Sequence, residues 1–175
     1  MSIKFLDPTY KRSITDFTYA PRLESFKDSV VAIISNGKRG TIPFFDCLET
    51  ELKERHQVAE VVRIIKSNYS TPVDSLLLND AERWNAMISG IGDGGSCSSC
   101  SLHDAIICER LGIPSVGIMT EPFGSAAALM GRVLGASKLE FVTITHPISS
   151  ASANDHSTRS RIACSEIINI LSGGD

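Results

Sequence analysis

Short apolar runs alternate with segments of helical periodicity from about residue 29 to the end of the chain. The runs are rich in Val, Ile and Met and end in polar residues or glycine. Continuous apolar runs of this length are typical of strands that are buried on both faces. The predicted strands are residues 30–34, 61–65, 86–91, 115–119 and 141–145.

Segments with helical spacing of apolar residues follow each of these runs. The predicted helices are residues 41–55 with Thr41 as N-cap, 73–84, 96 or 98 to 111, 122–134 and 158–171. Strands that alternate with helices predict an α/β fold with three layers, in which helices cover both faces of a mostly parallel sheet of about five strands. The expected arrangement is Rossmann-like or flavodoxin-like, with residues 1–27 as an N-terminal extension and residues 28–175 as a single domain.

Parallel sheets of this kind bind ligands at the carboxyl ends of their strands. The polar residues that follow the predicted strands are therefore candidates for a common site. We expect Lys38 and Lys66 to be able to hold a substrate carboxylate, and Asp93 to position the substrate or a water molecule. The residues assigned to substrate binding on this basis are Asn36, Lys38, Lys66, Asp93 and Thr120, and His146 is a candidate for proton transfer.

Residues 92–104, with the sequence GDGGSCSSCSLHD, form the most distinctive segment of the chain. Glycines allow a close approach of the backbone to a ligand, so Gly94, Gly95 and Ser96 are added to the substrate-binding residues. A helix that begins here directs its unpaired amides and its positive dipole end at the same space. A thiolate at that position is stabilised, which makes Cys97 the predicted nucleophile.

Cys97 and Cys100 form a Cys-x-x-Cys unit, which is compatible with a reversible disulfide or with a nucleophile and a resolving thiol. His103 lies three residues beyond Cys100 and is a candidate proton shuttle. The same spacing fits half of a zinc site, but the sequence offers no second Cys/His pair, so neither a metal nor a cofactor is expected. The remaining alternative is that both cysteines are buried and inert, as we expect for Cys47, Cys108 and Cys164.

Composition argues against several classes of protein. The net charge is −3 without a Lys/Arg cluster, which argues against a nucleic-acid or anionic-membrane partner. No apolar run has the roughly 18 residues needed to span a bilayer. Five cysteines, an odd number, make a disulfide framework improbable and favour a cytoplasmic location. A homodimer is possible, through the N-terminal extension or the Ala/Gly-rich residues 126–131.

The chain resembles the UGSC family, named for a selenocysteine-or-cysteine, Gly, Ser, Cys motif and related to the selenoprotein B component of glycine reductase. The resemblance covers most of residues 28–172. It is carried by Gly92-Asp93, Gly95-Ser96-Cys97, Ser101, His103-Asp104, Glu109, residues 112–114, Phe123 and His146-Pro147. Phe123 joins the substrate-binding candidates on this ground. In one respect the chain departs from the family, because the first reactive position falls on Gly94, and Cys100 occupies a place that is often aromatic.

Three functions fit these residues. The first is a cysteine-dependent enzyme that acts on a small polar or anionic molecule by covalent thiolate catalysis at Cys97, with His103 or His146 moving protons. The second is a thiol–disulfide redox protein that uses Cys97 and Cys100. The third is a non-catalytic binding subunit of a larger complex, which the absence of a cysteine at position 94 favours.

Overall fold

The computed structural model describes residues 17–173 and is built around a five-stranded sheet. All neighbouring strands pair in parallel, in the order β2-β1-β3-β4-β5. This order is that of flavodoxin-like sheets, in which the chain direction across the sheet reverses between β1 and β3. The strands are β1 (Val30–Ser35), β2 (Glu60–Ile65), β3 (Ala86–Gly92), β4 (Ser115–Thr120) and β5 (Phe141–Ile144).

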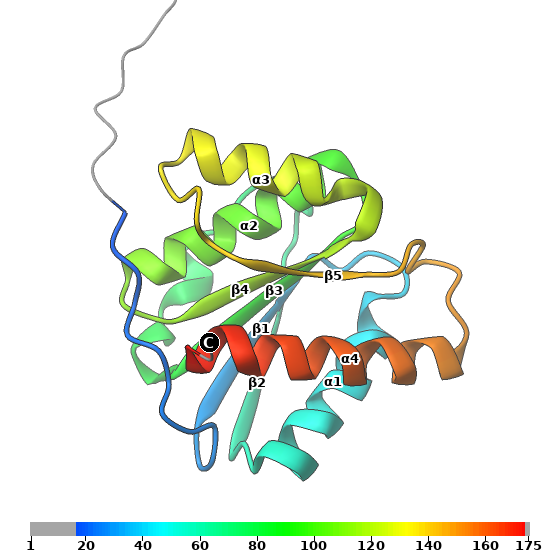
Figure 1. Cartoon of the computed structure of the whole chain (residues 1–175), viewed down its shortest axis with the longest axis horizontal. Coiled ribbons are helices and arrows are strands. Elements are labelled where there is room, and N and C mark those ends of the chain that lie inside the picture. The colour runs from blue at the N-terminus through cyan, green and yellow to red at the C-terminus, as the bar shows by residue number, and fades with distance from the viewer. Residues whose placement is uncertain (1–16, 174–175) are drawn as a thin grey trace, which may run out of the picture.

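Two helices cover each face of the sheet, which confirms the predicted three-layer α/β fold (Figure 1). Helices α1 (Thr41–His56) and α4 (Ala153–Ser172) pack on one face, where Phe44 and Ile167 enter the same apolar core. Helices α2 (Gly95–Arg110) and α3 (Gly124–Val133) pack on the other, where Leu102 and Ala127 share a second core. The central strands β3 and β4 are buried along their whole length, and this explains their uninterrupted small and apolar sequences.

The helix predicted over residues 73–84 is wrong. The structure has two short 3₁₀ turns there, Ser75–Leu78 and Ala81–Arg83. The Asp74 carboxylate accepts a hydrogen bond from the Leu76 amide (2.9 Å) and caps the first of these turns, which ends at Leu78. Three consecutive leucines also cannot share one helix face, and Leu76 is largely exposed.

Two other helix starts differ from the prediction. Thr41 is the first residue of α1 and not its N-cap, because Gly40 occupies that place with φ +88°. A Cβ at Gly40 would overlap the backbone of Ile148, so the position requires glycine. Helix α4 begins at Ala153, five residues earlier than expected, because Ser152 and Asp155 form a capping box.

Residues 17–27 lie along the domain. The buried Glu109 carboxylate at the end of α2 accepts hydrogen bonds from the Ala20 amide and the Arg22 guanidinium, and also from the Ser115 amide at the start of β4. The rest of the predicted N-terminal extension, residues 1–16, lies outside the described residues. Within residues 17–173, no helix combines the length and apolar character needed to cross a membrane.

Candidate functional site at the carboxyl edge of the sheet

A hydrogen-bonded His–Asp pair lies where β3 and β5 end. Asp93 follows β3 and His146 lies just beyond β5, and Nδ1 of His146 is 2.8 Å from Oδ1 of Asp93. A carboxylate only accepts, so the proton between them belongs to Nδ1, and in the neutral imidazole Nε2 then carries the lone pair. The His146 side chain is 38% exposed whereas that of Asp93 is 10% exposed. The pair therefore presents Nε2 as a proton acceptor near the surface, with its partner carboxylate below.

Thr120, the last residue of β4, completes this cluster. Its hydroxyl donates to Asp93 Oδ1 (2.9 Å) and lies 3.3 Å from His146 Nδ1. Phe123 meets the His146 ring edge-on, with the ring centroids 5.7 Å apart. Three strand ends thus bring Asp93, Thr120, Phe123 and His146 together, as the crevice rule predicts.

Lys38 lies at the reversal point between β1 and β3. A Cβ placed on Gly94 would be 3.6 Å from the Lys38 ammonium, so this cation adjoins the segment after β3. The buried Asn36 ties the two strand ends together: its amide donates to the Ile91 carbonyl, and its carbonyl accepts from the Lys38 amide. Tyr69, from the segment after β2, places its ring 5.1 Å from the Lys38 ammonium.

The glycines before α2 have different roles. A Cβ on Gly92 would overlap the Ser98 hydroxyl and the Met119 sulfur, so glycine is needed there for α2 to pack on the sheet. Gly94 has φ 173°, an extended conformation open to any residue, and a Cβ on Gly95 would meet no atom. The space above Gly95 is thus open, the Lys38 ammonium borders that above Gly94, and no side chain caps the first turn of α2. The amides of this turn are available to a ligand.

Cys97 and Cys100 point into the protein and not into this space. Cys97, at the third position of α2, is 1% exposed, and its sulfur is 4.0 Å from the Ser96 hydroxyl. Burial raises the pKa of the Cys100 thiol, and Asp104 and Cys97 raise it further, whereas Lys66 lowers it. Ser96 is thus exposed to solvent, whereas the two thiols are buried.

Lys66, at the carboxyl end of β2, forms a buried ion pair. Its ammonium is 2.7 Å from Oδ2 of Asp104, and the two side chains are 4% and 2% exposed. Asp104 also accepts from the Val73 amide through Oδ1 (2.7 Å). Burial raises the pKa of the Asp104 carboxyl, while Lys66 and the Val73 amide act in the opposite direction. One carboxylate on α2 thus holds both ends of the segment from Lys66 to Val73.

The remaining predicted residues lie on the helices that cover the sheet. His103 lies half-buried on α2. Burial raises the pKa values of Cys108 and Cys164 to about 12, and both side chains belong to the apolar cores, whereas Cys47 is partly exposed. Among residues 17–173 no three or more His, Cys, Asp or Glu side chains group in a way that could hold a metal ion.

Sequence reasoning missed Tyr69 and the double role of Asp104. Tyr69 lies in a polar segment without periodicity, so no pattern could place its ring over Lys38. For Asp104 the sequence predicted only a place in the helix that contains Cys97 and Cys100. Its partners lie 31 and 38 residues away, and a contact at such separation leaves no local signal.

Comparison with known proteins gives one result. A family-wide sequence model described as “UGSC family” matches residues 4–173, nearly the whole chain. No curated protein matches the chain. Of the residues that carry this resemblance, Asp104 and Glu109 bind other parts of the protein, whereas Asp93 and His146 lie at the carboxyl edge.

Proposed function

This chain belongs to the UGSC family, and we propose that it is an enzyme that acts on a small anionic molecule, with His146 as the proton-transfer residue. The observation that carries the proposal is the 2.8 Å contact between His146 and Asp93, supported by Thr120. A carboxylate on Nδ1 fixes the tautomer and the ring orientation and stabilises the imidazolium that forms. Nε2 then takes a proton from the substrate and returns it in a later step.

The anionic character of the substrate rests on the groups beside this pair. The Lys38 ammonium adjoins Gly94, and the first turn of α2 has no side-chain cap. A cation and unpaired helix amides both favour a carboxylate or a similar anion. Asp93 and Gly94 are consecutive, so an anion held at Lys38 has its neighbouring atoms near His146.

Cys97, for which the sequence predicts a covalent role, is the second candidate for the reactive group of this enzyme. Its support is the place of Cys97 in the uncapped first turn of α2, where helix amides favour a thiolate. Its burial means that local opening must precede any attack. The thiol–disulfide alternative needs the same opening of Cys97 and Cys100, and the raised pKa of Cys100 disfavours its thiolate.

The predicted cytoplasmic homodimer is also part of the proposal. Leu129 and Val133, one turn apart on α3, are both largely exposed, and this gives a second copy an apolar surface to cover. Light scattering of the purified protein tests the dimer. A monomer at all concentrations would remove this part of the proposal and leave the site unaffected.

Proton transfer can be tested without knowledge of the reaction. The protein is incubated in D₂O with a panel of 2-oxo acids of three to five carbons, and loss of C–H signals is followed by ¹H NMR. We expect exchange at the carbon next to the keto group of at least one acid, and a loss of exchange rate of about 10²- to 10⁴-fold in His146→Gln. His56→Gln, at the end of α1, is the matched control and is expected to retain the rate.

The other outcomes select among the alternatives. If Cys97→Ser abolishes exchange or turnover while His146→Gln leaves it intact, the covalent thiol is the reactive group. If no acid exchanges but some bind, the protein is a binding subunit, and the catalytic proposal is lost.

A further inference from the structure

The Lys66 ammonium has more N–H donors than the residues described by the structure satisfy. An ammonium carries three N–H groups. Among the described residues its one hydrogen-bond partner is Oδ2 of Asp104. The side chain is 4% exposed, so little water reaches it, and buried donors are normally paired. Its remaining N–H groups can therefore donate to an acceptor in the space beside it.

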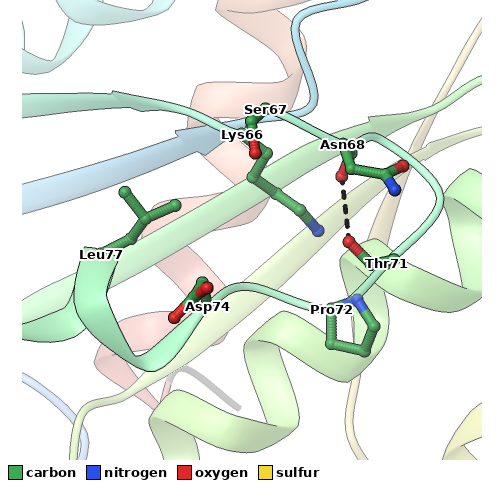
Figure 2. A pocket seen from close by; sticks show the side chains of 7 residues that line it. All are labelled: Lys66, Ser67, Asn68, Thr71, Pro72, Asp74 and Leu77. Atoms are coloured by element: carbon green, nitrogen blue, oxygen red, sulfur yellow. Dashed lines mark hydrogen bonds between the residues drawn. The ribbon is translucent and has the colours of Figure 1, made fainter.

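That space is a pocket of about 250 Å³. Figure 2 shows Lys66 extending from β2 toward the segment that carries Thr71 and Pro72, which encloses the pocket. The lining combines hydroxyl, amide and carboxylate groups with two small apolar surfaces. The residues are Lys66, Ser67, Asn68, Thr71, Pro72, Asp74 and Leu77.

The charges around the pocket select the class of ligand. Asp104 lies against Lys66 and neutralises it, and Asp74 adds a negative charge to the wall. A further anion would meet this net negative charge, so the pocket disfavours carboxylates and phosphates. Hydroxyl groups fit instead, because a hydroxyl can both accept from an ammonium and donate to a carboxylate or carbonyl oxygen, and the lining offers groups of all these kinds. Pro72 and Leu77 offer apolar contact to the carbon face of such a molecule.

The wall of the pocket is held in place before any ligand binds. Asp104 fixes both ends of the segment, through Lys66 and through the Val73 amide. Within the segment, Asn68 accepts from the Ser70 amide through its side chain and from the Thr71 hydroxyl through its carbonyl. A preformed wall lowers the ordering cost of binding, which allows a small ligand to bind there.

We propose that this pocket is a binding site for an uncharged polyhydroxylated group, of the size of a small sugar or polyol. It lies at the end of β2, and β1 separates that strand from β3 and the His146 cluster. The proposal does not depend on proton transfer at His146. It differs from the expectation that Lys66 holds a carboxylate, because the buried pairing with Asp104 cancels the charge that a carboxylate needs.

Chemical-shift mapping tests the site directly. D-ribose is titrated into the ¹⁵N-labelled full chain, with propionate as an anionic comparison. We expect saturable shifts of amides within residues 66–77 for ribose and none there for propionate, with Tyr69 left out of the comparison because its ring lies over Lys38. Thr71→Val removes one hydroxyl from the wall and should weaken ribose binding about three- to tenfold. Leu77→Trp fills the pocket and should abolish the shifts.

The matched control is Thr143→Val, the same change at an exposed position on β5, at the far edge of the sheet. It should bind ribose as the unmodified protein does. The proposal is overturned if ribose gives no saturable shifts in residues 66–77. It is equally overturned if neither pocket variant weakens ribose binding, or if propionate binds there more tightly than ribose. None of these outcomes bears on the D₂O exchange experiment, so the two proposals can fail separately.

Discussion

Two neighbouring regions of the carboxyl edge use polar groups in opposite ways. The ends of β3, β4 and β5 present His146 at the surface above the Asp93 carboxylate, with the imidazole 38% exposed. The first turns of α2 instead turn Cys97 and Asp104 inward, where both are almost completely buried. The first arrangement leaves a ring nitrogen for a ligand, and the second satisfies its groups within the protein.

The residues that stand out in the sequence are therefore not the ones that a ligand can reach in the folded protein. The Cys-x-x-Cys unit is the most conspicuous feature of the chain, yet its thiols face the interior. The His–Asp pair joins residues 53 positions apart, so no local spacing links them, yet its imidazole is accessible. Reactive groups must be reached by substrate, so we weigh the exposed pair above the buried thiols.

The largest effect is expected from breaking the buried ion pair. Lys66→Met leaves the Asp104 carboxylate buried without its cation, which should lower the free energy of unfolding by ~3–5 kcal/mol. Lys53→Met breaks an exposed pair with Glu49 on α1 and should cost less than about 1 kcal/mol. Urea denaturation of both variants measures the difference. Equal effects would contradict the burial of the Lys66 pair.

The stability of Lys66→Met should also depend on pH, in a direction set by the pKa of Asp104. A carboxyl whose pKa is raised in the folded state binds a proton there that the unfolded chain has lost. Its contribution to stability is therefore most favourable at low pH and is lost as pH rises through the folded pKa. Without Lys66 this dependence should steepen, so Lys66→Met should recover part of its lost stability when pH is lowered from 7 toward 5.

Thiol labelling compares the buried region with a partly exposed cysteine of the same chain. Cys97 and Cys100 should react with iodoacetamide about 100-fold more slowly than Cys47, which corresponds to an opening free energy of ~2.7 kcal/mol. Because burial raises the pKa of Cys100, its labelling should also keep rising at pH values where an unfolded thiol has levelled off. Mass spectrometry of peptides gives each rate. Fastest labelling at Cys97 would reverse the comparison and support covalent catalysis.

The tautomer of His146 tests whether Asp93 orients the ring of the exposed His–Asp pair. With Asp93 as acceptor, neutral His146 should carry its proton on Nδ1. Asp93→Asn offers both a donor and an acceptor, so the preference for Nδ1–H should be lost. The ¹⁵N shifts of the ring report the tautomer, and Asp46→Asn, at an exposed carboxylate on α1, is the control. An unchanged tautomer in Asp93→Asn would mean that Asp93 does not orient the ring.

The fold was predictable because its signals are local. Uninterrupted apolar strands such as β1 and β3, with amphipathic segments between them, led to the doubly wound sheet and to the strand ends where Asp93 and Thr120 lie. The 3₁₀ turns between β2 and β3 were not predictable from periodicity, since none of the residues Ser75–Leu78 is buried and no apolar face therefore marks the turn.

The inward direction of the cysteines was equally beyond pattern reasoning. Residues Gly95 and Cys97 both lie in the first turn of one helix, and only the packing of α2 on Gly92 decides which of them faces the sheet. Lys66 looked like a substrate ligand because it ends a strand. Its partner Asp104 comes from a separate element, so sequence alone could not show that its charge is already neutralised.

The smallest expected effect belongs to Thr120, whose hydroxyl donates to Asp93 and lies beside His146 Nδ1. Thr120→Val keeps the shape of this buried side chain and removes the donor, so Asp93 loses one of its two hydrogen bonds. We expect the preference of His146 for Nδ1–H to fall by about threefold, well short of the loss in Asp93→Asn, because a single neutral hydrogen bond contributes ~1 kcal/mol or less to orientation. Thr120→Ser retains the hydroxyl and should restore the preference, measured by the same ¹⁵N shifts. If Val and Ser behave alike, Thr120 acts through packing only, and the accessible pair is held by Asp93 alone.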